Sequence, residues 1–266
     1  MNFLIKLILI LYALPISLFA QTNLSNNDVA SEERVTLTVA IEEVGYFPFN
    51  YRENDELKGL SIDVLRYFEA NSNYNFEFKT VPWPRALQLT SVGKLDLILT
   101  LFQTPERKKT YHFIEPNYAF EANQLFTLID NQIEFSGQLE QLTPYSIATL
   151  REYSYGEYFD NAHYLKTLPA LTEEVLLKLL VAKRADMVIS NPLFFEKLAS
   201  KKKLTTKIKA LKPFVSVTPV YMALTKGRED SQEIHKKLSQ LTKQFKASTH
   251  YQELLTKYQL DYKRQR

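Results

Sequence analysis

The stretch from Val35 to Leu101 decides the fold, because short apolar strands alternate in it with amphipathic helices. VTLTVAI at Val35–Ile41 is β-branched and alternating, as a half-buried strand requires. Leu60–Asn71 has apolar residues at helical spacing, and Phe76–Val81 alternates again. A helix started by prolines and ending near Gly93 then leads into LDLILTL at 95–101. This order of strands and helices predicts a parallel sheet with helical crossovers.

A second unit of the same kind follows. Strands are predicted at Tyr145–Leu150 and Asp186–Ile189, and helices at Glu152–Asn161 and, after a Thr172 cap, at Glu173–Lys183. The chain passes between the units near Phe120–Gln124 and again near Val215–Pro219.

We therefore expect an α/β protein with two Rossmann-like lobes joined by a two-segment hinge. Lobe 1 comprises residues 35–120 and 220–266, and lobe 2 comprises residues 121–219. Ligand pockets favour interfaces of this kind, so we expect a cleft between the lobes.

The N-terminus predicts export. Lys6 precedes an apolar run from Leu7 to Phe19, and Ala20 is a small residue at a suitable cleavage position, so 1–20 is interpreted as a signal peptide rather than an uncleaved anchor. The polar residues 21–34 are expected to be a flexible lead-in. We predict a periplasmic location, and the absence of cysteine excludes disulfides.

Composition argues against several functions. The formal net charge is +3 and the lysines are scattered, so no concentrated basic face for nucleic acid is expected. The run Lys201–Lys203 is interpreted as a solvated loop. The four histidines have no evident nucleophile partner and no metal-ligand spacing. We expect a monomer without metal or cofactor.

The segment TPERKK at Thr104–Lys109 places Arg107 just after an apolar strand and a proline-opened turn. Small ligands bind at strand ends in α/β sheets, and a guanidinium can donate two parallel hydrogen bonds to a carboxylate. A guanidinium paired with a surface carboxylate fits the same spacing.

Five motifs together resemble periplasmic solute-binding proteins of family 3, which serve polar amino acid uptake and have the type II periplasmic-binding fold. They are YFPF at 46–49, GLSIDV at 59–64, GKLD at 93–96, TPER at 104–107 and ADMVI at 185–189. The resemblance implies capture of a small carboxylate-bearing solute, an amino acid or a related aromatic or cyclic acid, by hinge closure. It implies delivery to an inner-membrane ABC permease or a receptor. A cyclohexadienyl-dehydratase-like enzyme derived from the same fold, with Glu43 or Glu152 as general acid or base, is the alternative.

The resemblance also implies ligand contacts. Arg107 matches the arginine that holds the ligand carboxylate, and Thr100 lies in the strand before it. Tyr46 matches the aromatic that covers the ligand, with core packing as its alternative role. Ser154 matches a hydroxyl that assists the carboxylate, with a plain helix cap as its alternative.

Two further residues are expected either to contact the ligand or to have a structural role instead. Glu43 would face a cationic group of the ligand or be a solvated loop acid, and Trp83 would contact the ligand or anchor the helix between Pro82 and Pro84. Trp83, Tyr46, Phe102, Tyr153 and Tyr155 all lie near predicted strand ends, which predicts an aromatic cleft.

The sequence departs from the family pattern at two expected cleft positions. Asn191 stands where amino acid binders usually have an aspartate for the ligand's ammonium group, and an amide cannot offset that charge. Phe102 stands where a small or hydroxyl residue is usual. Both departures count against a standard α-amino acid as the solute.

Overall fold

The structure is a computed structural model that describes residues 33–43 and 45–262. The predicted signal peptide, and the lead-in except for its last two residues, lie outside the described residues. From Arg34 onward the chain forms one compact unit. None of the helices described in this unit is both long enough and apolar enough to cross a bilayer.

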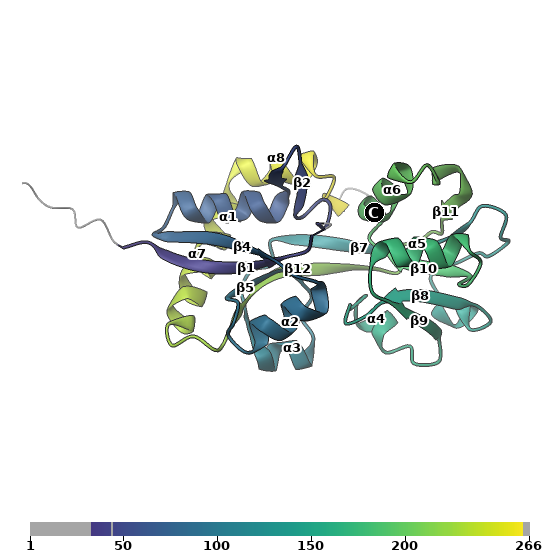
Figure 1. Cartoon of the computed structure of the whole chain (residues 1–266), viewed down its shortest axis with the longest axis horizontal. Helices are drawn as coiled ribbons and strands as arrows, with labels where there is room; N and C mark the ends of the chain where they lie inside the picture. The colour runs from purple at the N-terminus through teal and green to yellow at the C-terminus, as the bar shows by residue number, and fades with distance from the viewer. Residues whose placement is uncertain (1–32, 44, 263–266) are drawn as a thin grey trace, which may run out of the picture. The chain divides into compact units, whose positions relative to one another are not determined.

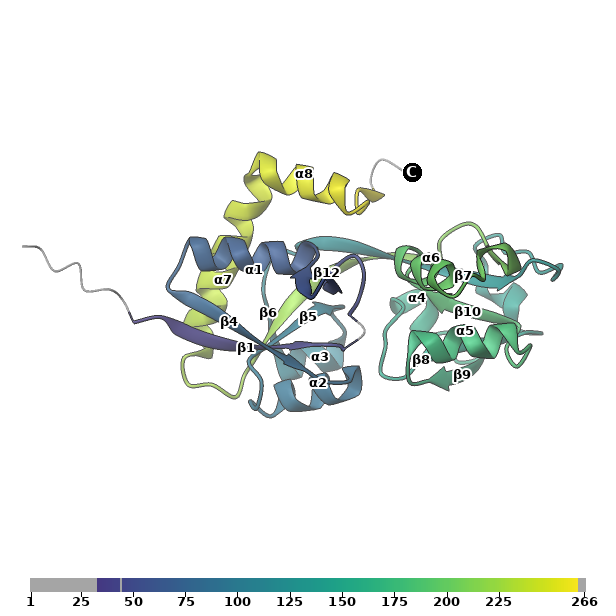
Figure 2. The ribbon, with the colours of Figure 1, turned by 45° about the horizontal axis from the view of Figure 1, so that its top comes forward.

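The predicted parallel arrangement of the first strands is confirmed. β1 (Val35–Ile41) pairs in parallel with β4 (Tyr74–Thr80) and with β5 (Leu97–Leu101). The connecting helices, α1 (Leu60–Ala70) and α2 (Trp83–Ser91), cover opposite faces in both views (Figures 1 and 2). A small hairpin, β2 (Tyr51–Glu53) with β3 (Glu56–Lys58), precedes α1 and was not predicted.

The second strand group is also parallel. β8 (Ser146–Leu150) lies between β10 (Met187–Ser190) and β9 (Lys166–Ala170), and α5 (Glu173–Val181) and α6 (Pro192–Lys201) flank β10 in sequence. The sequence did not predict β9, because KTLPA is largely exposed and contains a proline. Both features are compatible with an edge strand, where one row of backbone groups needs no partner.

Two long strands join the groups into one sheet. β7 (Ala119–Leu128) and β12 (Ser216–Thr225) pair antiparallel over Ala119–Asn123 and Ser216–Val220. β12 continues beside β5 and β6 (Tyr111–Phe113), while β7 continues beside β10 and β11 (Ile208–Ala210). We call β4, β1, β5 and β6 the first sheet half, and β10, β8, β9 and β11 the second. The predicted crossings coincide with the shared ladder, whereas the lobe boundaries remain a prediction.

The remaining helices are short, apart from the C-terminal pair. α7 (Ser231–Ala247) and α8 (Thr249–Lys257) follow β12, and α7 packs on α1. The short ones are α3 (Pro105–Thr110), α4 (Glu157–Asp160) and the 3₁₀ turns Leu139–Leu142 and Thr205–Lys207.

The helix predicted at Glu152–Asn161 is mostly wrong. It begins only at Glu157, because Glu152 at φ 61° and Gly156 at φ 95° have left-handed backbone conformations that interrupt a helix. Residues 151–156 are therefore a loop, which contributes to the site described next.

Candidate functional site

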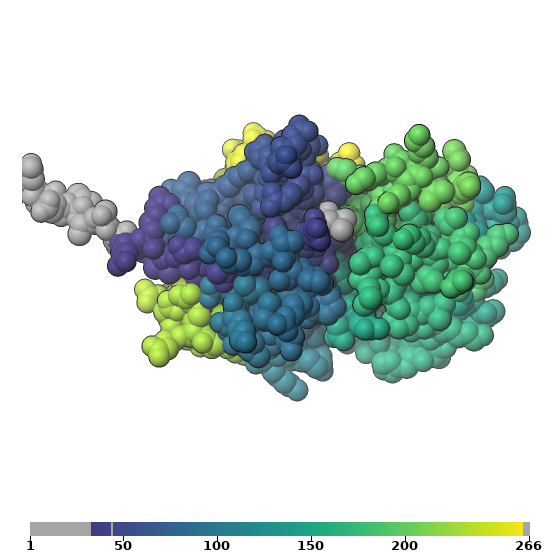
Figure 3. Space-filling view, in the orientation of Figure 1, coloured from purple at the N-terminus to yellow at the C-terminus, as the bar shows by residue number. Residues whose placement is uncertain are grey.

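A pocket of about 250 Å³ lies where several parallel strands reach their carboxyl ends. Glu42 and Glu43 follow β1, Val81 and Trp83 follow β4, and the segments after β8 and β9 complete the wall. The pocket therefore takes residues from both sheet halves, whose blue and green atoms adjoin on the face shown in Figure 3. The carboxyl ends of parallel strands are the usual ligand position in α/β folds.

Aromatic rings form the inner wall of the pocket. Tyr153 packs edge-on to Tyr46, with ring centroids 6.0 Å apart, and lies 5.4 Å from the Trp83 ring. Phe194, at the start of α6, lies 5.4 Å from Tyr46 on the other side. Rings of this kind offer apolar area and a negative π face at little entropic cost.

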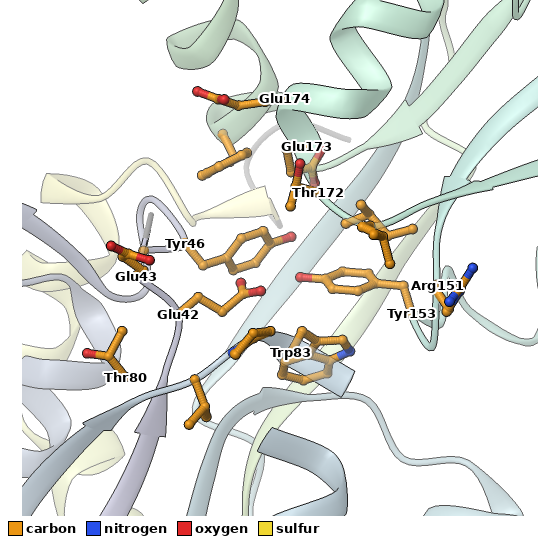
Figure 4. Close-up of a pocket in the computed structure, with 16 residues that line it drawn as sticks. Glu42, Glu43, Tyr46, Thr80, Trp83, Arg151, Tyr153, Thr172, Glu173 and Glu174 are labelled. Atoms are coloured by element: carbon orange, nitrogen blue, oxygen red, sulfur yellow. The ribbon is translucent and has the colours of Figure 1, made fainter. Parts of the chain in front are cut away.

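Four carboxyl groups line the same pocket. Figure 4 shows Glu42 and Glu173 near the two tyrosines and Glu43 and Glu174 towards the edges. Burial raises the pKa of Glu42 to about 7, opposed by the backbone N–H of Trp83. Burial raises the pKa of Glu173 to about 8. Both carboxyl groups therefore exchange their proton near neutral pH, whereas an ordinary glutamate is already fully ionised there.

Glu173 has one satisfied and one free oxygen. It is the first residue of α5, which Thr172 caps by accepting a hydrogen bond from the Val175 N–H. Its Oε1 accepts a hydrogen bond of 3.0 Å from the Ser190 hydroxyl at the end of β10. Its Oε2 has no hydrogen-bond partner among the described residues, although the side chain is only 8% exposed. A buried acceptor without a partner is costly unless a ligand or water supplies a donor.

A second buried acid lies behind the aromatic wall. The Tyr46 hydroxyl donates a hydrogen bond to Glu121, which is 1% exposed and has a pKa raised to about 7 by burial. Asn191 caps α6 through its Oδ1, which accepts from the Phe194 N–H, and its amide lowers the pKa of Glu121. Its Nδ2 makes no hydrogen bond of standard geometry with the described residues. Asn191 does not itself line the pocket.

Arg107 lies outside the pocket lining. Its guanidinium donates to the Phe102 carbonyl at 3.2 Å and to the Glu152 carbonyl at 2.9 Å. The Trp83 indole N–H donates to the same Glu152 carbonyl at 3.2 Å. The Arg107 guanidinium borders two other depressions, which are more open than the pocket. Burial lowers the pKa of Arg107.

The predicted site residues therefore separate into two groups. Tyr46, Trp83 and Glu43 line the pocket, and Thr100 lines a small adjoining cavity of about 20 Å³ with Tyr46 and Trp83. Phe102 is buried in the core. Ser154 donates to Asp160 and borders an open depression with Tyr155, so its hydroxyl supports the loop before α4. A ligand role for each of these residues remains a prediction.

Sequence reasoning missed Glu42, Thr172 and Glu173. Glu42 is the first residue after a strand and adjoins Glu43, which is a usable signal for a strand-end site. Thr172 and Glu173 have the pattern of an ordinary helix start, so nothing local marked them as pocket residues. No group of three or more potential metal-ligand side chains converges within residues 33–43 and 45–262.

The fold and pocket are those of a small-molecule-binding protein with the type II periplasmic-binding fold. The profile of the bacterial extracellular solute-binding proteins, family 3, matches residues 37–261, and this chain belongs to that family. The probable amino-acid-binding protein YxeM of Bacillus subtilis is 31% identical over 86 residues, which cover 32% of each chain. The match thus spans about a third of that relative's length.

Solved structures match over most of the described chain. A histidine kinase sensor domain with similarity to periplasmic binding proteins has a TM-score of 0.74 at 17% identity and covers 85% of this chain and 96% of its own. The ancestral amino acid-binding protein AncCDT-1, a precursor of cyclohexadienyl dehydratase, has a TM-score of 0.67 at 21% identity and covers 84% and 94%. At these identities the likeness establishes the fold alone.

Proposed function

We propose that this protein captures a small solute with a cationic group in the pocket at the ends of β1 and β8, without converting it. The observation that carries the proposal is the buried Glu173 carboxyl: the residue lines a cavity walled by aromatic rings, and its Oε2 has no hydrogen-bond partner among the described residues. Carboxylates and π faces attract the same kind of ligand, a cation. The volume is near the lower end of roughly 300–1,000 Å³ for ligand pockets, which favours a small solute.

The cellular role is proposed from the family. We place the protein in the periplasm as a monomer that delivers its solute to an inner-membrane ABC permease or a sensor receptor. The family's extracellular location and the amino-acid-binding relative support this role. The resemblance predicted that a carboxylate on the solute binds to Arg107. In this structure Arg107 donates hydrogen bonds to two backbone carbonyls and does not line the pocket.

The dehydratase-like alternative has one observation in its favour. Glu42 and Glu173 have pKa values near neutrality, which suits a general acid or base. Mass spectrometry separates the two functions. Capture predicts that a bound solute is recovered unchanged after prolonged incubation, whereas turnover predicts a product that accumulates with time.

The chain has a built-in probe for capture. Trp83 is the only tryptophan and lines the pocket, so a bound solute should change its fluorescence in a saturable way. A ligand at 100 times its dissociation constant should also stabilise the protein by about 2.7 kcal/mol, or roughly 5–10 °C in melting temperature. The panel should contain cationic, neutral and anionic solutes at matched concentration. Saturable binding restricted to anionic or neutral solutes would refute a cation-selective pocket.

A further inference from the structure

We infer that the solute is a small organic amine without a carboxylate, such as a diamine or a guanidino-amine, held through N–H donors by Glu173 and Glu42. This inference rests on the proposed function and names the substrate class of the same pocket. It departs from the amino acid that the resemblance predicted, because the described lining of the pocket offers acceptors for a cation and no buried cationic partner for a carboxylate.

The acceptor side of the site is built. Glu173 lines the pocket and is more than nine-tenths buried, and its Oε2 lacks a hydrogen-bond partner among the described residues. Figure 4 shows the Glu173 and Glu42 side chains on opposite sides of the tyrosine pair. An ammonium or guanidinium in the pocket can donate to either carboxyl group, and a charged donor makes the stronger kind of hydrogen bond.

A buried cationic partner for a carboxylate is missing from the described lining. Arg151 is the only basic residue in it, and its side chain is exposed and points away from Tyr46 and Glu42 (Figure 4). Arg107 is outside the lining, and the carbonyl groups of Phe102 and Glu152 already accept its donors. Two of its five N–H donors are thereby used within the protein, and its guanidinium borders depressions other than this pocket.

The N-terminus of α5 does not replace the missing donor. Helix starts favour anions, but the first turn of α5 already contains Glu173 and Glu174. These two acidic side chains disfavour a ligand carboxylate at this helix start, because like charges raise the cost of binding. The charge of the described lining therefore favours a cationic ligand without a carboxylate.

Matched ligand pairs test the inference directly. Lysine with cadaverine, ornithine with putrescine, and arginine with agmatine differ only by the α-carboxylate. We expect the amine of at least one pair to bind about 100-fold more tightly than its amino acid, since an unpaired buried carboxylate is costly. Isothermal titration calorimetry at pH 8.5, with Trp83 fluorescence as a second readout, gives both constants.

Two variants and one control assign the contacts. Glu173→Gln keeps the shape of the side chain and should weaken amine binding by about 30-fold or more. Glu42→Gln should also weaken amine binding. Glu134→Gln changes an exposed glutamate away from the pocket and should leave the dissociation constant unchanged. Circular dichroism confirms that each variant is folded, and Glu42→Gln keeps the test decisive if Glu173→Gln fails to fold.

The outcomes separate the inference from the function. Tighter amine binding that depends on Glu173 or Glu42 supports both. Tighter amino acid binding that is lost in Arg107→Ala overturns the inference and leaves the proposed capture of cationic solutes intact. If none of the amines and amino acids in these pairs binds saturably, both the inference and the proposed cation-binding function are overturned.

Discussion

Replacing Glu173 by glutamine should change how the stability of the ligand-free protein depends on pH. Burial raises the pKa of Glu173 from 4.5 to about 8. Between these values the unfolded chain has released this proton and the folded protein retains it. The contribution of Glu173 to stability is therefore fully present below pH 4.5 and is lost as the pH rises through about 8.

The magnitude follows from proton linkage. One proton bound only by the folded state changes the unfolding free energy by about 1.4 kcal/mol per pH unit, so the wild type loses roughly 4 kcal/mol through Glu173 between pH 5 and pH 8. Glutamine cannot ionise, so the variant lacks this loss. Its stability relative to the wild type should rise by that amount across the interval.

Urea unfolding at pH 5, 6, 7 and 8 measures this difference through the change in free energy extrapolated to water. Glu174→Gln is the matched control, because Glu174 is the next residue in the chain but is only partly buried, and the hydrogen bond from Lys202 lowers the pKa of Glu174. The control should retain the wild-type slope. Parallel pH profiles for Glu173→Gln and the wild type would refute the assignment of a buried, protonated carboxyl to this position.

Four further substitutions, of which Gly137→Ala is the control for Gly59→Ala, test other parts of the site and fold. Arg107→Ala removes two hydrogen bonds to backbone carbonyls and should lower the unfolding free energy by about 1–3 kcal/mol; unchanged urea stability would show that these bonds contribute nothing. Tyr46→Phe leaves Glu121 without its hydroxyl donor and should cost about 1–3 kcal/mol, and a variant at least as stable as the wild type would contradict that role. Gly59→Ala would place Cβ 2.3 Å from a backbone oxygen at φ +123° and should cost more than about 3 kcal/mol. Gly137→Ala, where φ is +99° and the nearest atom is 3.4 Å away, should cost only about 1 kcal/mol, and equal losses at both glycines would contradict the packing argument.

Local pattern was sufficient for most of the framework. Strand β1 and helix α1 follow from apolar periodicity, which depends only on residues near in sequence. The pattern failed at β9, whose exposed residues leave no apolar alternation, and at Glu152–Asn161, where left-handed backbone ends the expected helix early. In both places the conformation is imposed by neighbours that are distant in the chain.

The sequence by itself determined most of the order of strands and helices, apart from β2, β3, β9 and the start of α4, as well as the family and the position of Tyr46, Trp83 and Glu43 near strand ends. Tertiary structure alone decided the surroundings of two charged groups. Arg107 is held by a carbonyl 45 residues away. Glu173, which looks like an ordinary helix-start acid, lines a pocket and lies against Ser190, and its second oxygen has no hydrogen-bond partner among the described residues. A charge's partners and pKa depend on which distant atoms exclude water from it, and no local pattern contains that information.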